Sequence, residues 1–223
     1  MKIPPWSYSS LNAYKTCPKQ YYEIKVLKNY TPQETEATRW GNEVHKAAEL
    51  RVKNVAELPE RMMAFAPIIE KFVDLPGETL VEQKIAITIE GESVDFFDNS
   101  VWARGIIDLL NIRNNGKALN LDWKTGKVKP DSAQLVMSSA MVFHTYPQVK
   151  EITAVFVWLG YNKITTQTFY RDDLERMWGI FGKDLAEMTW SYENNAWPPR
   201  ESGLCRGWCP VETCQYWRPM RKK

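Results

Sequence analysis

The hydrophobic positions of the chain repeat with two different periods, and the order of these periods predicts a mixed α/β fold. Apolar residues recur every three or four positions in some segments, as in amphipathic helices, and alternate or run continuously in others, as in strands. Helices are predicted at about 7–15, 38–53, 58–73 with a break at Pro67, 131–146 and 172–190, with a further helical run after Pro18. Strands are predicted at 80–89, 101–113, 117–124, 152–159 and 164–170.

The two strands at 101–113 and 117–124 flank an Asn-Asn-Gly turn, and the geometry of this turn decides which side chains share a face. A two-residue turn would put Asp108 and Asp122 on opposite faces of the hairpin. A three-residue loop with Gly116 in the left-handed conformation instead pairs position 113 with 117, and therefore 108 with 122. The alternation of the second strand favours the three-residue loop, because it places Ile107 and Leu109 with Leu121 and Trp123 on the core side.

Two carboxylates opposite each other would repel unless a cation lay between them, so this register predicts a divalent metal site at Asp108 and Asp122. Oxygen ligands suit Mg²⁺ or Mn²⁺. Lys124 projects to the same face as Asp122, where it could orient or deprotonate a water molecule or stabilise charge on a phosphate. The alternative is an exposed strand with an ordinary surface pair of Asp122 and Lys124.

Four motifs in a fixed order, together with an N-terminal segment, resemble the PD-(D/E)XK nuclease superfamily and its RecB-like branch, which includes the small iron–sulfur exonucleases of CRISPR adaptation. The segment and the motifs are Ser7 to Tyr21 with Cys17-Pro18, Gly41 to His45, Gly105 to Asp108, Asp122-Trp123-Lys124, and Gln134. The resemblance covers positions 7 to about 217. It implies an α-β-β-β-α-β core, a restriction-endonuclease-like mixed sheet flanked by helices.

The resemblance also assigns roles to side chains. It implies that His45 binds the metal with Asp108 and Asp122, that Lys124 assists catalysis, and that Glu82 and Gln134 support the site. Without it, His45 would be read as a packed side chain beside a helical stripe, and Glu82 as an edge-strand charge. The branch usually has Tyr four residues after the Gln, where this chain has Ser138.

The bulk composition is that of an ordinary globular protein, with 44% hydrophobic and 25% charged residues and a net charge of +2. A nucleic-acid-binding protein of this balance must concentrate its basic residues locally. No apolar run follows the first residues or reaches membrane-spanning length, so no signal peptide or membrane segment is expected and a cytoplasmic location is predicted. Residues 1–223 are expected to form one nuclease domain, with helices in 1–75, the catalytic sheet in 78–190 and a cysteine segment in 197–217.

The four cysteines of the chain are Cys17, Cys205, Cys209 and Cys214. In an intracellular protein they are expected to be reduced ligands rather than disulfides. The resemblance implies a [4Fe–4S] cluster that joins the two ends of the chain, although the C-x₃-C-x₄-C spacing departs from the C-x₂-C-x₅-C that is commoner in the branch. Zinc and free or oxidised thiols are the alternatives.

The function expected from these features is hydrolysis of DNA phosphodiester bonds by a metal-dependent exonuclease acting on single-stranded ends in recombination, replication or repair. Two alternatives remain. One is a nuclease that trims DNA for CRISPR adaptation, and the other is a non-catalytic DNA-binding subunit that kept the fold. A helicase or recombination protein is a possible partner in each case, and Lys127, Lys129 and a basic tail of Arg218, Arg221, Lys222 and Lys223 could contact the DNA.

Overall fold

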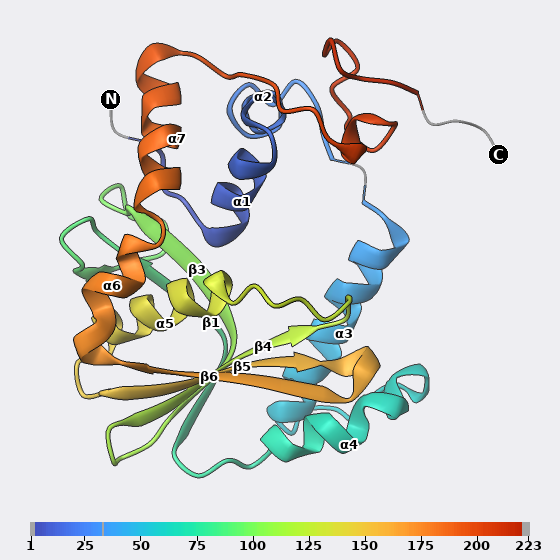
Figure 1. Cartoon of the computed structure of the whole chain (residues 1–223). Coiled ribbons are helices and arrows are strands. Elements are labelled where there is room, and N and C mark those ends of the chain that lie inside the picture. Colours follow the sequence, from blue (N-terminus) through green and yellow to red (C-terminus); the bar gives the residue numbers. More distant parts are fainter. Residues whose placement is uncertain (1–2, 33, 220–223) are drawn as a thin grey trace. The chain divides into compact units, whose positions relative to one another are not determined.

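The structure, a computed structural model, describes residues 3–32 and 34–219, which fall into two compact units (Figure 1). The sheet unit comprises residues 35–179, and the terminal unit comprises the described parts of 1–34 and 180–223. Arg221, Lys222 and Lys223 of the expected basic tail lie outside the described residues. That the whole chain works as one nuclease domain stays a prediction.

A six-stranded mixed sheet forms the centre of the sheet unit, in the order β2-β1-β3-β4-β5-β6. Only the β4–β5 pair is parallel, and the crossover between these two strands contains helix α5. The strands are β1 (Glu78–Ile87), β2 (Ser93–Val94), β3 (Ala103–Ile112), β4 (Lys117–Lys124), β5 (Glu151–Trp158) and β6 (Lys163–Tyr170). The predicted α/β class and order of elements are confirmed, with the short β2 as an addition.

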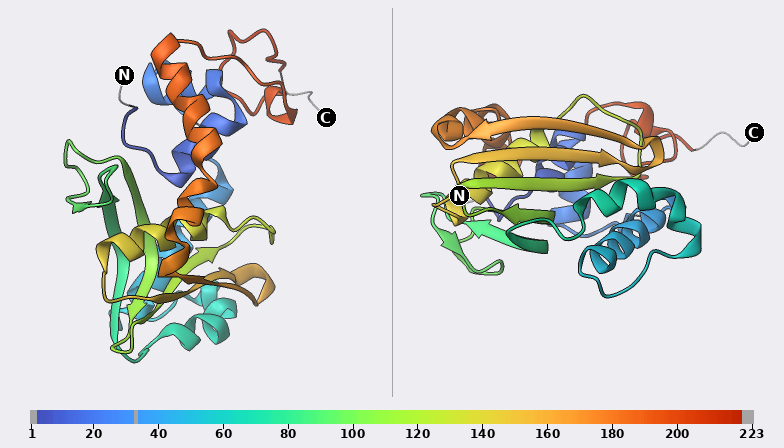
Figure 2. Two further views of the ribbon diagram at one scale, coloured as in Figure 1. Left: turned by 60° about the vertical axis from the view of Figure 1, so that its left-hand side comes forward. Right: turned by 90° about the horizontal axis from the view of Figure 1, so that it is seen from below.

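Helices cover both faces of this sheet (Figure 2). Helix α5 lies over the face of Asn120, and α3 lies over the face of Leu121. The helical elements of this unit are α3 (Glu36–Val52), α4 (Ala66–Ile69), α5 (Ala133–Thr145) and α6 (Leu174–Gly179), with short 3₁₀ segments at Glu60–Phe65, Glu70–Phe72, Leu159–Tyr161 and Arg171–Asp173. No helix among residues 3–32 and 34–219 is both long and apolar enough to cross a membrane.

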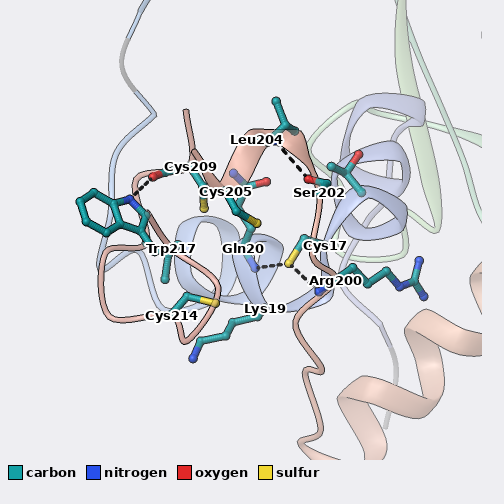
Figure 3. A pocket seen from close by; sticks show the side chains of 12 residues that line it. Cys17, Lys19, Gln20, Arg200, Ser202, Leu204, Cys205, Cys209, Cys214 and Trp217 are labelled. Carbon is teal, nitrogen blue, oxygen red and sulfur yellow. Dashed lines mark hydrogen bonds between the residues drawn. The ribbon is translucent and has the colours of Figure 1, made fainter. Parts of the chain in front are cut away.

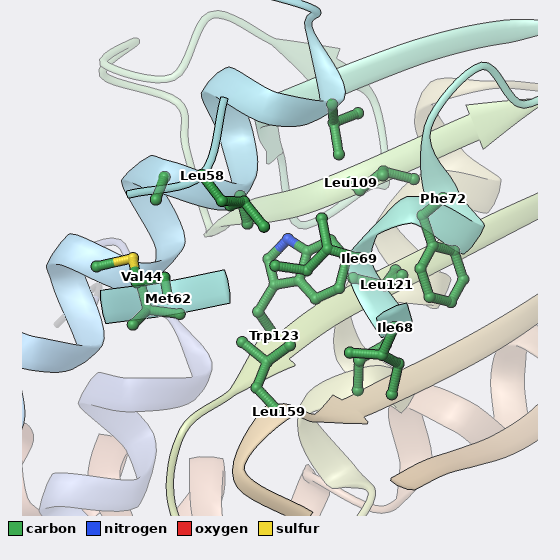
Figure 4. Close-up of a cluster of buried hydrophobic side chains, with 14 of the residues drawn as sticks. Val44, Leu58, Met62, Ile68, Ile69, Phe72, Leu109, Leu121, Trp123 and Leu159 are labelled. Atoms are coloured by element: carbon green, nitrogen blue, oxygen red, sulfur yellow. The ribbon is translucent and has the colours of Figure 1, made fainter. Parts of the chain in front are cut away.

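A cluster of buried side chains joins α3 and the 60–72 segment to one face of the sheet (Figure 4). Trp123 of β4 lies in its centre and packs edge-on against Phe72, with ring centroids 5.6 Å apart. The predicted stripe of α3 faces this cluster, with Val44 and Ala48 almost fully buried. Burying each large apolar side chain contributes roughly 1.5–3 kcal/mol, so this cluster fixes the position of α3 on the sheet.

The predicted three-residue hairpin loop is confirmed. The backbone N–H of Arg113 donates to the carbonyl of Lys117, and Gly116 has φ +78°. The ladder then pairs Ile112 with Ala118 and continues to Leu109 and Leu121. The same register sets Asp108 opposite Asp122, but the ladder ends one pair before them, and the two strands separate there.

The side-chain alternation of β1 and β3 changes at Glu82 and Asp108. Glu82 has φ +52°, a left-handed conformation that is uncommon in a strand and costs energy for a residue other than glycine. Before this point Leu110 shares a face with Asn120, whereas beyond it Gly105 lies beside Met141 of α5. Ile107 is therefore buried but does not belong to the core cluster of Trp123, contrary to the prediction.

The terminal unit brings the first and last parts of the chain together. Its helices are α1 (Tyr8–Thr16), α2 (Pro18–Tyr21), a π-helical turn (Tyr22–Val26), α7 (Gly182–Asn194) and a 3₁₀ turn (Gly203–Cys205). Ser7 caps α1 through a capping box with Ser10. The hydroxyl of Tyr14 lies 2.7 Å from that of Ser191, which ties α1 to α7.

Two predicted helices are not continuous. The single helix expected over 172–190 is instead α6 and α7, separated between Gly179 and Gly182, because glycine is a poor helix former. The helix expected over 58–73 consists mainly of 3₁₀ turns around α4, whose first turn contains Pro67.

Candidate metal centre and active site

His45, Glu82 and Asp108 come together on three different elements of the sheet unit. Their potential ligand atoms all lie within 4.8 Å of one another. His45 projects from α3, Glu82 from β1 and Asp108 from β3, so residues far apart in sequence meet at one point. Nδ1 of His45 is 3.2 Å from Oδ2 of Asp108.

Local features of the backbone direct the Glu82 and Asp108 side chains. The left-handed turn at Glu82 interrupts β1 directly opposite Asp108. Where the ladder between β3 and β4 ends, the backbone N–H of Trp123 donates to Oδ2 of Asp108 at 2.8 Å. The carboxylate thus replaces a missing ladder bond, and this fixes its orientation.

Asp122, Lys124 and Gln134 form a second group, linked by side-chain hydrogen bonds. Nζ of Lys124 is 2.6 Å from Oδ2 of Asp122 and donates to Oε1 of Gln134 at 2.8 Å. The amide nitrogen of Gln134 donates to Oδ1 of Asp122. Gln134, in the first turn of α5, therefore connects both residues of the D-x-K motif. The Lys124 ammonium also lies 5.0 Å from the centre of the Phe156 ring.

The two groups are electrostatically coupled. Burial, reinforced by the charge of Asp108, raises the pKa of Asp122 to about 7. Burial and the charges of Asp108 and Glu49 raise the pKa of Glu82. Burial opposes protonation of His45, but its hydrogen bond to Asp108 and the nearby carboxylate charges outweigh this effect and raise its pKa. Perturbation of this kind is common at functional sites.

The chemistry of these residues fits a divalent cation. Imidazole and carboxylate are ligands that Mn²⁺ accepts, and carboxylates suit Mg²⁺. Oδ2 of Asp122 is buried without a hydrogen bond of good geometry, although Lys124 is near it. A cation would offset the repulsion among the carboxylates. The predicted ligand set was His45, Asp108 and Asp122, whereas the compact cluster contains Glu82 in place of Asp122.

Two features of the site were not predicted. Glu49 is one helical turn beyond His45 on α3, where its carboxylate binds Lys46 and Lys53 at 2.7 Å each. Spacing of four residues from His45 was the signal that could have identified it. Its charge acts on Glu82.

The second unpredicted feature is a buried polar contact between β4 and α5. The Asn120 amide donates to the hydroxyls of Ser138 and Ser139 at 2.7 and 2.9 Å. Ser138, which stands where the branch usually has Tyr, therefore faces the sheet. Asn120 is two residues before Asp122, so this contact fixes α5, and with it Gln134, relative to the D-x-K motif.

The four cysteines lie in the terminal unit, around one pocket (Figure 3). Cys17 caps α2, and its sulfur accepts the backbone N–H groups of Gln20 and Arg200 at 3.5 and 3.4 Å. The other three come from the 205–214 loop, in which the carbonyl of Cys205 accepts the N–H of Arg218. Arg218, the first residue of the predicted basic tail, is thus hydrogen-bonded within this segment.

The cysteine arrangement is open. Among the described residues no three cysteine sulfurs lie within 4.8 Å of one another. Four thiolates on one zinc ion would be about 3.8 Å apart, given zinc–sulfur bonds of roughly 2.3 Å. The pocket therefore places the sulfurs around a common space without the spacing of a closed zinc site.

Comparison with known proteins gives one matching family and a shared fold. A family model described as the PD-(D/E)XK nuclease superfamily matches residues 5–82. No curated protein sequence matches the chain. The fold is similar to a crystal structure from Eubacterium rectale whose exonuclease name is provisional, with TM-score 0.55 and 11% identity over 98% of this chain and 90% of that one.

A protein designated SSO0001 is 15% identical over 96% of this chain and 87% of that chain, with TM-score 0.47. The first similarity, at its low identity, concerns the fold alone. The RecB-like branch stays a prediction. Over residues 5–82, the resemblance of the sequence to the PD-(D/E)XK nuclease superfamily is confirmed. The chain as a whole shares its fold with the Eubacterium rectale structure.

Proposed function

We propose that this protein is a metal-dependent DNA exonuclease that hydrolyses phosphodiester bonds at single-stranded ends in recombination, replication or repair. The family match and the fold support a nuclease. The observation that carries the proposal is the meeting of His45, Glu82 and Asp108 beside the linked Asp122 and Lys124.

In this proposal His45, Glu82 and Asp108 hold Mg²⁺ or Mn²⁺, with Asp122 as a further ligand. A bound divalent ion would polarise the phosphate and lower the pKa of a coordinated water. Lys124 orients the attacking water or stabilises charge on the phosphate, and Gln134 holds the Lys124 ammonium and the Asp122 carboxylate in a fixed relation. Lys124 and Asp122 lie in a largely buried setting, where the charge of the lysine would interact more strongly with a phosphate than it would in water.

We further propose that the four cysteines hold a [4Fe–4S] cluster in the terminal unit. The two backbone N–H groups that point to Cys17 would stabilise a thiolate, and the open spacing of the sulfurs favours a cluster over a single zinc ion. No catalytic candidate lies within either cysteine segment, so the role of the cluster would be structural.

Hydrolysis of labelled single- and double-stranded DNA by the full chain, with Mg²⁺ or Mn²⁺, tests the function. We expect release of nucleotides from single-stranded ends, and no release in EDTA. A matched closed circular single strand separates an exonuclease from an endonuclease. Binding without cleavage of any of these DNAs, by protein with its cysteine site intact, would instead identify a non-catalytic subunit.

A further inference from the structure

Beyond the metal centre, β1 and β3 carry a group of aromatic and basic side chains that the site does not use. Phe96 and Phe97 follow the short strand β2, and their rings meet edge-on with centroids 5.2 Å apart. Phe97 is 77% exposed, the largest exposed fraction of any large hydrophobic side chain in the described part of the chain. Ile106 of β3, also in this region, is 47% exposed.

Two cations lie over both rings. Nζ of Lys84 is 5.7 Å from the centre of the Phe96 ring and 5.8 Å from that of Phe97. Cζ of Arg104 is 5.2 and 5.8 Å from the same two centres. The Arg104 guanidinium also donates to the carbonyl of Phe96, which holds it at the rings. Neither cation has a carboxylate ion pair among the described residues.

The strand register places this group next to the metal centre. Lys84 pairs with Ile106 across β1 and β3, and two residues further along the same strands Glu82 and Asp108 occupy opposite positions where the ladder is interrupted. Two residues of strand span roughly 7 Å, and the four residues from Asp108 to Arg104 span roughly 13 Å. The rings and cations therefore begin about one nucleotide repeat from the carboxylates.

We propose that Phe96, Phe97, Lys84 and Arg104 form a stacking platform for unpaired nucleotides next to the phosphate that is cut. The proposal rests on the proposed function and extends it by naming where the single strand binds. Exposed aromatic rings offer faces on which bases of any sequence can stack, and adjacent cations pair with the phosphates between them. The bases inside a duplex are already stacked on one another, so their faces are not free to stack on these rings.

The charges of the surrounding loop set the character of this binding. Asp95 and Asp98 flank the two phenylalanines, and Asp98 accepts from the backbone N–H and hydroxyl of Ser100, which closes the turn. The platform is therefore not a strongly positive surface. We expect stacking to dominate the binding. The logarithm of the binding constant should fall only shallowly with the logarithm of the salt concentration, with a slope of about −0.7 for each of two contacted phosphates.

Fluorescence of 2-aminopurine tests the platform directly. The full chain is mixed in EDTA, where no cleavage occurs, with single-stranded oligonucleotides carrying 2-aminopurine at successive positions from either end. We expect quenching at one or two adjacent positions. Phe97→Ala should abolish the quenching and weaken binding roughly 5-fold or more, since base stacking contributes about 1–3 kcal/mol per base. Phe97→Trp should restore both.

Two controls separate stacking from other effects. Ile89→Ala removes an apolar side chain that is 65% exposed in the turn between β1 and β2, and it should bind as the wild type does. A strand with abasic residues at the quenched positions should bind the wild type as weakly as Phe97→Ala binds the normal strand. Thermal unfolding of each variant confirms that the exposed substitutions leave the fold intact.

The outcomes distinguish this inference from the proposed function. Equal binding of normal and abasic strands, unchanged binding by Phe97→Ala, or preference for blunt duplex would overturn the platform, even if the protein cuts DNA. Quenching that depends on Phe97 in a protein that cuts nothing would support the platform and overturn the nuclease. If Phe97→Ala lowers neither binding nor quenching but loses capture of a second protein, the surface is a protein interface and the platform is wrong.

Discussion

The two candidate metal sites of this protein are built on opposite principles. The carboxylate site of the sheet unit stands on paired strands and one long helix, above a core of closely packed aromatic and aliphatic side chains. The cysteine site of the terminal unit stands on a helix cap and on a loop that has no strand ladder beyond one isolated bridge. The first is held by a strand ladder and a buried core, whereas the second is held by a helix cap and loop hydrogen bonds, so we expect the second to depend more on a bound ligand for its order.

This difference is expected from the task of each site. A group that acts on a substrate must be held in position before the substrate arrives, and strands with buried cores provide this. A structural ligand set can gain its order from the metal itself, because metal binding is coupled to folding. The carboxylate site should therefore lose activity without losing the fold, and the cysteine site should lose the fold of its unit.

The largest expected effect is on catalysis. Lys124→Ala and Asp108→Asn should each lower the cleavage rate by at least about 10²–10³-fold, because Lys124 is proposed to stabilise charge on the reacting phosphate and Asp108 is proposed to hold the metal. Cleavage rates at saturating metal and DNA, with circular dichroism as the test of folding, measure this. Lys150→Ala, an exposed lysine away from the site, is the control. Wild-type turnover by either site variant would show that the active site is misassigned.

The next effect is on the stability of the cysteine unit. Cys17→Ala and Cys209→Ala should each lower the melting temperature and solubility and remove absorbance in the visible range, because each removes a ligand of the proposed cluster. Asp122→Ala should keep the colour and lose the activity. Iron, sulfide and zinc analysis after purification under nitrogen identifies the metal.

Colourless protein with stoichiometric zinc would show that the cysteines bind zinc and not an iron–sulfur cluster. The proposed metal cross-link between the two chain ends would still stand. If the Cys17→Ala variant is as stable as the wild type, and the wild type has no metal at its cysteines, then no metal cross-link joins the two chain ends.

A smaller effect is expected at the contact between β4 and α5. Asn120→Ala should destabilise the protein by about 1–3 kcal/mol, because the two serine hydroxyls lose a buried donor. It should also reduce cleavage by moving Gln134 relative to Lys124. Urea unfolding and cleavage rates measure the two consequences, with Asn114→Ala in the exposed hairpin loop as the control. If stability falls while cleavage is unchanged, Asn120 does not position the site.

The smallest effect concerns pH and metal-free protein. Burial raises the pKa of Asp122 to about 7, above its value in the unfolded chain. The folded state then holds a proton that the unfolded chain releases near pH 4, so this group stabilises the fold less as pH rises from about 4 to about 7.

Comparison with Asp122→Asn in EDTA isolates this contribution. Over that pH window the free energy of unfolding should shift in favour of the variant by about 1 kcal/mol or more, since each pKa unit corresponds to about 1.4 kcal/mol. Urea unfolding of both proteins at several pH values measures the difference. A constant difference from pH 4 to 7 would contradict the raised pKa, and Mg²⁺ or Mn²⁺ should remove the wild-type deficit if the ion binds there.

Several features of the fold could be predicted from the sequence because short-range geometry decides them. The Asn-Asn-Gly turn fixes the loop length, the loop length fixes the register, and the register sets Asp108 opposite Asp122. The stripe of α3 follows from helical spacing in the same way. The single helix predicted over 172–190 is wrong although its break is local, because Gly179 and Gly182 disfavour the helix that the apolar spacing alone would continue.

The composition of the metal centre was decided by the tertiary structure. Glu82 reaches His45 and Asp108 because the backbone of β1 turns left-handed at that residue, and period-two alternation does not reveal such a turn. Asp122 instead bonds Lys124 and Gln134, since α5 lies over its face of the sheet. Which of several carboxylates share a point in space depends on contacts between segments distant in sequence, and only the packed chain specifies these.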